Sequence, residues 1–133
     1  MIKNQSLLIT GGTGSFGKAF VSKIINSGIK MRRLVIFSRD ELKQSEMAEM
    51  YPKKKYPFIR FFLGDVRDQK RLHTAMQKID LVIHAAALKQ VVSTEYNPFE
   101  AVKTNIIGAQ NIIECAISTG VKNVVALSTD KAA

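Results

Sequence analysis

The 133-residue sequence has one cysteine, no tryptophan, three prolines and no long apolar run. The single cysteine, Cys115, excludes a disulfide framework and is typical of a protein from a reducing compartment. The apolar runs are far shorter than the roughly 20 residues that a membrane-spanning helix needs. The N-terminal residues lack the apolar core and cleavage site of a secretory signal. These absences predict a cytoplasmic globular protein without a membrane span.

Acidic residues are also scarce, and the formal net charge is +9. An excess of positive charge of this size is typical of a protein that binds an anionic partner. However, the two densest basic clusters, Lys53–Lys55 and Lys30–Arg33, fall in connections between predicted elements and have no interleaved aromatic residues. We therefore expect solvated loops rather than a nucleic-acid groove. An anionic dinucleotide and an anionic sugar nucleotide fit the charge equally well.

A glycine-rich stretch, Thr10–Gly17, follows the apolar run Leu7–Ile9 and precedes a helical pattern. Its spacing is G-x-x-G-x-x-G, with Gly11, Gly14 and Gly17 as the glycines. Such glycines permit a tight turn, close approach of the backbone to a pyrophosphate, and close packing of helix on strand. The helix N-terminus then offers N–H groups and a positive dipole end to the phosphates. A turn without a ligand is the alternative, but this place in the chain favours a dinucleotide site.

Short apolar runs alternate with helical patterns along the whole chain. We expect strands at residues 7–10, 34–37, 59–63, 80–86 and 124–127, and helices at 15–27, 40–50, 67–77 and 97–120. This alternation predicts an α/β fold, namely a Rossmann-like, doubly wound parallel sheet of strand order 3-2-1-4-5. Residues 1–133 then form one dinucleotide-binding domain that stops after the fifth strand. The ligand crevice should lie between strands 1 and 4.

The second strand ends about 20 residues past the glycines, where a dinucleotide-binding fold meets the adenosine ribose. Ser38 and Arg39 there suit a 2′-phosphate, whereas an acidic residue would bind the ribose hydroxyls of NAD. Asp40 keeps the second possibility open, and we favour NADP. Ser38 and Glu41 also have the spacing of a capping box, so they could begin the next helix.

The third strand is closed by Gly64, Asp65 and Val66. The Asp65 carboxylate can accept from an adenine amino group while the Val66 backbone lies along the ring. Equally, Asp65 or Asp68 could cap the following helix. The small residues after His84 could admit a nicotinamide ribose or simply pack tightly, and His84 itself is not assigned to the site.

Six segments together resemble a known family: TGGTGSFGKAF, SRDELKQSEM, RFFLGDVRD, IHAAALKQV, EYNPFEAVKTNIIGAQN and LSTDKAA. With them the chain resembles the extended short-chain dehydrogenase/reductases, and more narrowly the inverting UDP-N-acetylglucosamine 4,6-dehydratases of the pseudaminic acid type. The resemblance implies a lyase in which NADP takes a hydride from carbon 4 of the sugar and returns it to carbon 6 after water has left. The product would be a UDP-4-keto-6-deoxy sugar for surface or flagellar polysaccharides.

The same resemblance implies a set of site residues. Cofactor contacts fall on Gly11, Thr13, Gly14, Ser15, Phe16, Gly17, Ser38, Arg39, Asp40, Glu41, Leu42, Lys43, Asp65, Val66, Ala85 and Lys89. Lys89 and Thr104 would contact the substrate. Asp130 would protonate the leaving hydroxyl, and Lys131 would remove the carbon 5 proton, since burial can lower the pKa of a lysine. Without the resemblance, Asp130 and Lys131 are typical of a terminal loop. No metal site is expected.

The family's Tyr-x-x-x-Lys pair should follow Lys131 by roughly ten residues, and the sequence has no such pair there. We therefore expect the N-terminal part of a longer enzyme, inactive by itself and a homo-oligomer in its full-length form. An epimerase or oxidoreductase of the same superfamily is the first alternative, and a non-catalytic dinucleotide-binding module is the second. The fourth helix carries Val102, Ile106, Ile113, Ala116 and Ile117, which we expect to face the core.

Overall fold

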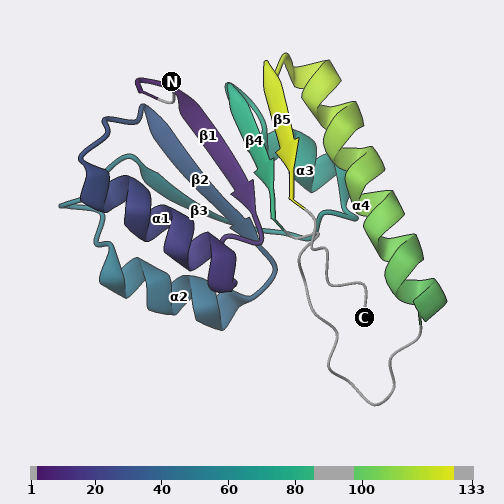
Figure 1. Ribbon diagram of the computed structural model, residues 1–133, viewed down its shortest axis with the longest axis horizontal. Coiled ribbons are helices and arrows are strands. Elements are labelled where there is room, and N and C mark those ends of the chain that lie inside the picture. The colour runs from purple at the N-terminus through teal and green to yellow at the C-terminus, as the bar shows by residue number, and fades with distance from the viewer. Residues whose placement is uncertain (1–2, 86–97, 128–133) are drawn as a thin grey trace.

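The computed structural model describes residues 3–85 and 98–127, with side chains left out for 98–105. Its strands and helices alternate strictly along the described chain (Figure 1). In order they are β1 (Ser6–Thr10), α1 (Ser15–Ser27), β2 (Arg33–Ser38), α2 (Glu41–Met50), β3 (Ile59–Leu63), α3 (Gln69–Ala75), β4 (Leu81–His84), α4 (Pro98–Thr119) and β5 (Asn123–Ala126). Each predicted element is confirmed, with small differences at the ends.

The sheet has the order β3-β2-β1-β4-β5, as predicted, and each neighbouring pair of strands is parallel. All the strands therefore end at one edge of the sheet, toward the bottom of Figure 1. The strand order reverses between β1 and β4, where Thr10 lies opposite His84. Ligands of such sheets bind outside the carboxyl ends at this reversal.

Helices α1 and α2 cover one face of the sheet, and α3 and α4 cover the other (Figure 1). Because alternate residues of a strand point to opposite faces, Leu7 and Ile9 pack with the α1 side, and Leu8 packs with the α3 and α4 side. All of β1 is buried. This explains why the strands read as continuous apolar runs rather than as alternating ones.

The predicted core stripe of α4 is wrong in part. Ile106, Ile113 and Ile117 are exposed by 60%, 54% and 77%, whereas Ile112 and Cys115 are buried against the sheet. Ala116 is buried as predicted. The helix is 22 residues long and lies beside the short strands β4 and β5 at one end of the sheet order. Only part of its surface can therefore reach the sheet.

Helix ends decide two alternatives that the sequence left open. Asp40 is the N-cap of α2 and accepts from the Lys43 N–H at 3.0 Å, so the capping box of Ser38 and Glu41 is wrong. Ser38 instead ends β2. Asp68, not Asp65, caps α3. Across residues 3–85 and 98–127, none of the helices is long and apolar enough to cross a membrane.

Candidate functional site

The glycine-rich turn between β1 and α1 stands at the carboxyl edge of the sheet. Gly11 has a φ of 68°, which favours glycine, and its N–H donates to Phe37 O at 2.9 Å. Gly14 is the N-cap of α1, and no described side chain caps that helix. The first N–H groups of α1 therefore depend on water or on a bound anion.

Two glycines in this turn are required by packing. A Cβ on Gly17 would lie 2.4 Å from the carbonyl carbon and oxygen of Gly12, and one on Gly12 would lie 2.6 Å from Ile36 Cγ2. A Cβ on Gly14 would meet nothing nearer than Gly11 O at 3.4 Å. The predicted turn and close-packing roles thus belong to Gly11 and Gly17, and the packing role of Gly12 was not predicted from the sequence.

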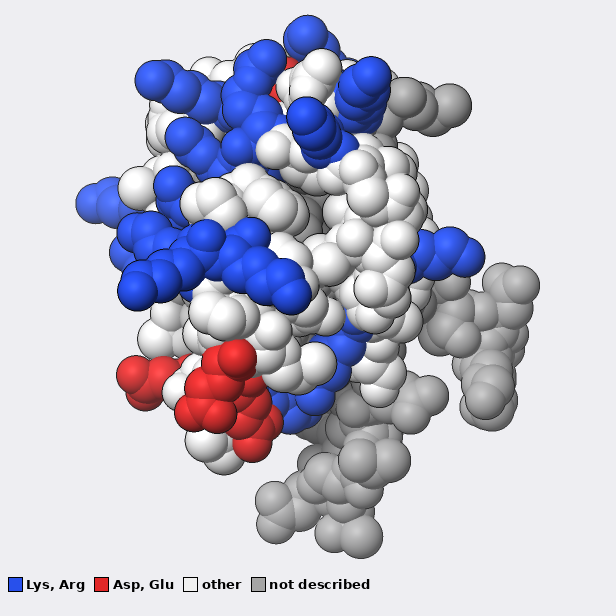
Figure 2. Space-filling model, turned by 90° about the vertical axis from the view of Figure 1, so that its left-hand side faces the viewer, with Lys and Arg blue, Asp and Glu red and all other residues white. Residues whose placement is uncertain are grey.

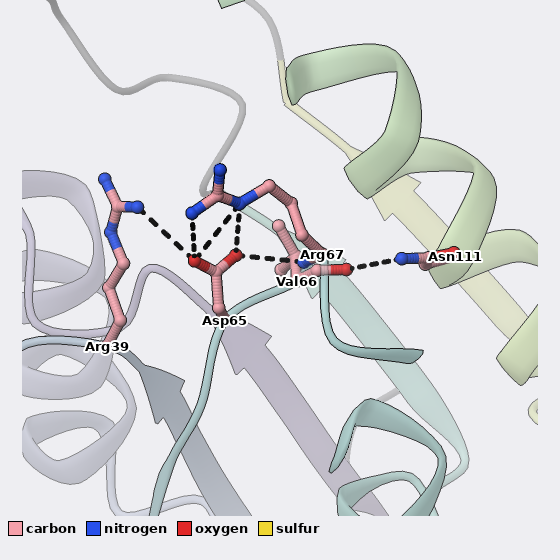
Figure 3. A network of polar contacts seen from close by, with 5 residues as sticks. All are labelled: Arg39, Asp65, Val66, Arg67 and Asn111. Atoms are coloured by element: carbon pink, nitrogen blue, oxygen red, sulfur yellow. Dashed lines mark hydrogen bonds and ion pairs between the residues drawn. The ribbon is translucent and has the colours of Figure 1, made fainter. Parts of the chain in front are cut away.

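Three charged side chains meet at the ends of β2 and β3 (Figure 3). Asp65 Oδ2 accepts from Arg67 Nη2 at 2.9 Å and from Arg39 Nη1 at 3.4 Å. Asp65 Oδ1 accepts from the Arg67 backbone N–H at 2.9 Å and from Arg67 Nε at 3.2 Å. The Arg67 side chain and the Arg39 side chain are each about half exposed.

This arrangement fixes the ionisation of Asp65. The hydrogen bonds from the Arg67 side chain, helped by the backbone N–H and by both guanidinium charges, outweigh partial burial and lower the pKa of Asp65 to about 2. Asp65 is therefore a carboxylate throughout the physiological range. It can accept hydrogen bonds but cannot donate one.

Val66 is held from the opposite side by α4. Asn111 Nδ2 donates to Val66 O at 3.0 Å, and a Cβ on Gly108 would lie 2.9 Å from Val66 Cγ2 (Figure 3). Gly108 and Asn111 are three residues apart, so they share one side of the helix. The predicted adenine loop, Gly64–Val66, thus follows β3 directly and is held on its other side by α4.

The segment after β2 exposes some of its predicted ligands and not others. Ser38 is buried, and its hydroxyl accepts from Gln44 Nε2 at 2.9 Å. Asp40 is engaged as the cap of α2. Arg39, by contrast, extends to the surface and contacts Asp65. Glu41, Leu42 and Lys43 are all exposed in the first turn of α2.

At the start of α1, Thr13 is buried, whereas Ser15 and Phe16 are exposed. The strand reversal itself is held by a buried side-chain bond of 2.8 Å between Thr10 Oγ1 and His84 Nδ1. Burial lowers the pKa of His84 below its ordinary value, so the ring is neutral there. Ala85 follows at once and donates its N–H to Thr10 O at 3.2 Å.

The remaining predicted residues cannot be placed against this geometry. Lys89, Asp130 and Lys131 lie outside the described residues. Thr104 belongs to α4, and its side chain is among those left out. Their roles stay predictions.

The sequence does contain a tyrosine and a lysine four residues apart, Tyr51 and Lys55. They lie between α2 and β3, at the amino end of β3 and so away from the carboxyl edge. The Tyr51 ring packs edge-on against Tyr56, with centroids 5.4 Å apart. The spacing alone therefore does not place this pair in the site.

Two residues that hold the site, Arg67 and Asn111, were not predicted from the sequence. Arg67 follows Asp65 by two residues, and this nearness was the available signal. No local signal joins Asn111 to Val66, because the two residues are 45 positions apart.

Comparison with known proteins agrees with this architecture. The UDP-N-acetylglucosamine 4,6-dehydratase (inverting) of Campylobacter jejuni is 53% identical over 132 residues, which is 99% of this chain and 38% of that protein. The UDP-glucose 4-epimerase of Rickettsia conorii is 47% identical over 134 residues, again 99% and 38%. The X-ray structure of Pen from Bacillus thuringiensis is 44% identical with a TM-score of 0.82, over 95% of this chain and 37% of that one.

The chain thus spans well under half the length of these relatives. The predicted resemblance to the inverting dehydratases is confirmed by the first comparison. The family described as polysaccharide biosynthesis protein matches over residues 7–133. That match covers nearly the whole sequence, and the chain belongs to this family.

Proposed function

We propose that this chain is the cofactor-binding part of a cytoplasmic, NADP-dependent UDP-N-acetylglucosamine 4,6-dehydratase that inverts carbon 5 of the sugar. The observation that carries the proposal is the meeting of the glycine-rich turn, Arg39 and Asp65 at one edge of a sheet. The 53% identity to an inverting dehydratase supports the reaction. In its full-length form we expect a homo-oligomer that supplies sugar for pseudaminic acid or a related surface glycan.

The engagement of Asp40 supports NADP over NAD. A carboxylate at this point would bind the ribose hydroxyls of NAD, but the Asp40 side chain already caps α2 at 3.0 Å from the Lys43 N–H. The guanidinium of Arg39, the residue directly before Asp40, is about half exposed. A guanidinium binds a phosphate with paired, charge-assisted hydrogen bonds. The pyrophosphate would lie at the uncapped start of α1.

A bound nicotinamide would supply the chemistry of taking and returning the hydride. We assign the proton transfers to this chain, with Lys131 as the base at carbon 5 and Asp130 as the acid at the leaving hydroxyl. Lys89 and Thr104 would position the sugar beside the cofactor. A lysine can act as a base near neutral pH when burial lowers its pKa.

Titration of the chain with NADP and with NAD tests the cofactor. We expect NADP to bind at least about tenfold more tightly, the ratio that one charge-assisted contact provides. The Arg39→Gln variant should abolish the difference, and Arg32→Gln, an exposed arginine just before β2, serves as the matched control. Equal affinity of the unaltered chain for the two cofactors would contradict the NADP assignment.

A second function, UDP-glucose 4-epimerase, is favoured by the 47% identical relative. Incubation with NADP and either UDP-N-acetylglucosamine or UDP-glucose distinguishes the two by the product. We propose that the 133-residue chain alone turns over neither substrate, because it covers only 38% of the length of the related dehydratase and of the related epimerase. A 4-keto-6-deoxy product would support the dehydratase and overturn the proposed inactivity, whereas a C4 epimer would favour the second function.

A further inference from the structure

The amino edge of the sheet, which lies opposite to the candidate site, is rich in positive charge. The connections that lead into the strands are residues 3–5, 28–32, 51–58, 76–80 and 120–122. They hold eight lysine and arginine residues but a single acidic residue, Asp80. The eight basic residues are all exposed and make up a basic surface: Lys3, Lys30, Arg32, Lys53, Lys54, Lys55, Lys78 and Lys122. Figure 2 shows basic side chains gathered toward this edge over one face of the molecule.

Backbone contacts place these connections side by side. The Asn4 N–H donates to Lys30 O at 2.7 Å, and the Lys122 N–H donates to Asp80 O at 3.0 Å. The connections before β2 and β3 are neighbours because these strands pair in parallel, and the same holds for β1 and β4. The eight cations therefore lie along one edge rather than at scattered points.

Few carboxylates balance this basic surface among the side chains that the structure describes. The Asp80 side chain accepts from the Ser6 N–H at 2.8 Å, so it is engaged with the backbone. The ion pairs of the described side chains join Arg39 and Arg67 to Asp65 at the opposite edge, and none of them involves the eight cations. A surface with so much unbalanced charge of one sign attracts a polyanion.

The chemistry of the basic surface favours anionic lipid headgroups over a nucleic acid. Seven of the eight cations are lysines, whose ammonium groups on flexible stems suit headgroups that have no fixed pattern. A nucleic acid would call for an element that enters a groove, or for aromatic rings on which bases stack. The cations here stand on connections. The Tyr56 ring packs edge-on against Tyr51 and Phe58, with centroids 5.4 and 6.4 Å apart, so these rings do not form a stacking platform.

We propose that this basic surface binds the anionic lipid headgroups of a membrane, so that the sheet stands on its amino edge. Ile29, beside Lys30, is 37% exposed and adds an apolar contact at the level of the headgroups. Because the strands are parallel, the carboxyl edge then points away from the lipid, and the glycine-rich turn stays open to solutes. Such binding is independent of the cofactor and of the reaction proposed above.

Vesicle sedimentation of the whole 133-residue chain tests the proposal. The comparison is between vesicles of phosphatidylcholine alone and vesicles that also contain about 30% phosphatidylglycerol, which is anionic. The chain should bind only the anionic vesicles, and raising the salt from about 0.1 to about 0.5 M should release it, because salt screens exposed charges. Equal binding to both kinds of vesicle, or binding that salt does not weaken, would contradict the proposal.

Paired substitutions locate the binding surface. Lys30→Gln with Lys54→Gln removes one cation from each of two neighbouring connections, and we expect the affinity for anionic vesicles to fall by about tenfold or more. The matched control, Lys18→Gln with Lys70→Gln, removes the same charge from exposed positions in the first turns of α1 and α3, at the carboxyl edge. It should weaken binding by less than about twofold, because charges far from the membrane are screened. An equal loss in the two variants would show that net charge alone attracts the chain and would overturn the proposal.

Two further measurements decide the partner and the orientation. A mixed-sequence DNA duplex at the same salt should bind more weakly than the anionic vesicles do. Tighter binding of the duplex that Lys30→Gln with Lys54→Gln weakens would overturn the proposal in favour of nucleic acid. Amide exchange of the unaltered chain should slow at residues 28–32 and 51–58 on the vesicles but not at 11–17. The reverse pattern would count against the proposed orientation and overturn it, and this readout stands even if a variant fails to fold.

Discussion

At the scale of single residues, some glycines of the glycine-rich turn are needed for the packing of the fold, and another leaves room where we propose that a ligand binds. A Cβ on Gly17 would clash with the Gly12 backbone, and one on Gly12 would clash with the Ile36 side chain. Gly14, in contrast, has room for a Cβ and stands at the uncapped start of α1. Glycine is therefore needed for packing at positions 12 and 17, whereas at position 14 it keeps the start of α1 open for the proposed ligand. This division is visible only once the neighbours in space are known.

Gly17→Ala should destabilise the fold, because its Cβ would lie 2.4 Å from the Gly12 backbone and a backbone shift is unavoidable. We expect a loss of about 1–3 kcal/mol in the free energy of unfolding, the usual cost of overpacking, measured by urea denaturation. Gly14→Ala is the control and should change the free energy of unfolding by less than about 1 kcal/mol. It should nevertheless weaken the binding of NADP. Equal stability losses in the two variants would contradict this account.

Asp65 should make stability depend on pH in the acid range. Its pKa is lowered from 3.8 to about 2 in the folded chain, so its contribution is complete above the unfolded value and is lost as pH falls from about 4 to about 2. The exposed arginine partners limit this contribution to about 1 kcal/mol. Urea denaturation of Asp65→Asn and of the unaltered chain should differ at pH 7 and converge near pH 2. A difference that persists at pH 2 would contradict it.

At the scale of elements, α4 joins the sheet to the predicted adenine loop. Its Ile112 and Cys115 pack on the sheet, while Gly108 and Asn111 hold Val66. Helix α4 thus fixes the position of this loop relative to the carboxyl edge of the sheet. We therefore expect a change in α4 to alter the positions of Asp65 and Arg67, the two neighbours of Val66.

Asn111→Ala should loosen this loop. Loss of the 3.0 Å bond to Val66 O leaves a partly buried carbonyl without that donor, and we expect a loss of about 1 kcal/mol in stability with faster amide exchange at residues 66–68. Gln110→Ala is the matched control, because Gln110 is exposed on the same helix and bonds to Glu114 at 3.0 Å. Unchanged exchange in Asn111→Ala would show that α4 does not hold the loop.

The helices and strands could be predicted from the sequence because the features that produce them lie close together in the chain. The apolar run Leu34–Phe37 and the glycine at the end of α1 each predict structure from neighbours in the chain. The bond between Asn111 and Val66 depends on helix packing across 45 residues. The α4 stripe failed for a related reason, since apolar residues at helical spacing mark an apolar side without saying how much of it the sheet can cover.

At the scale of the whole molecule, basic side chains also gather away from the candidate site. Figure 2 shows Lys and Arg side chains gathered over the upper part of one face, toward the amino ends of the strands, with Asp and Glu below them. Lys53–Lys55 lie in the connection that leads into β3, and Arg32 and Arg33 stand at the start of β2, which agrees with this view. This basic surface lies toward the amino ends of the strands, whereas Arg39 and Asp65 follow the carboxyl ends of β2 and β3.

The exposed side chains Ile113 and Ile117 of α4, with Val125 of β5, should drive self-association, since an apolar surface of this kind is unfavourable in water. We expect the chain to associate at micromolar concentrations in analytical ultracentrifugation. The double variant Ile113→Glu and Ile117→Glu should shift it toward monomer. Met50→Glu, which alters an exposed apolar residue on α2, should not. A strictly monomeric unaltered chain would contradict the prediction.

Strand β2 contacts the glycine-rich turn and also leads directly into Arg39. Its Ile36 supports Gly12, its Phe37 accepts from the Gly11 N–H, and Arg39 follows its last residue. The length of β2 therefore sets the distance between the glycine-rich turn and Arg39, which we propose as contacts of the pyrophosphate and of the 2′-phosphate. One residue added or removed between Phe37 and Arg39 would change that distance by about 3.3 Å. We expect the proposed cofactor then to reach the turn or Arg39, but not both at once.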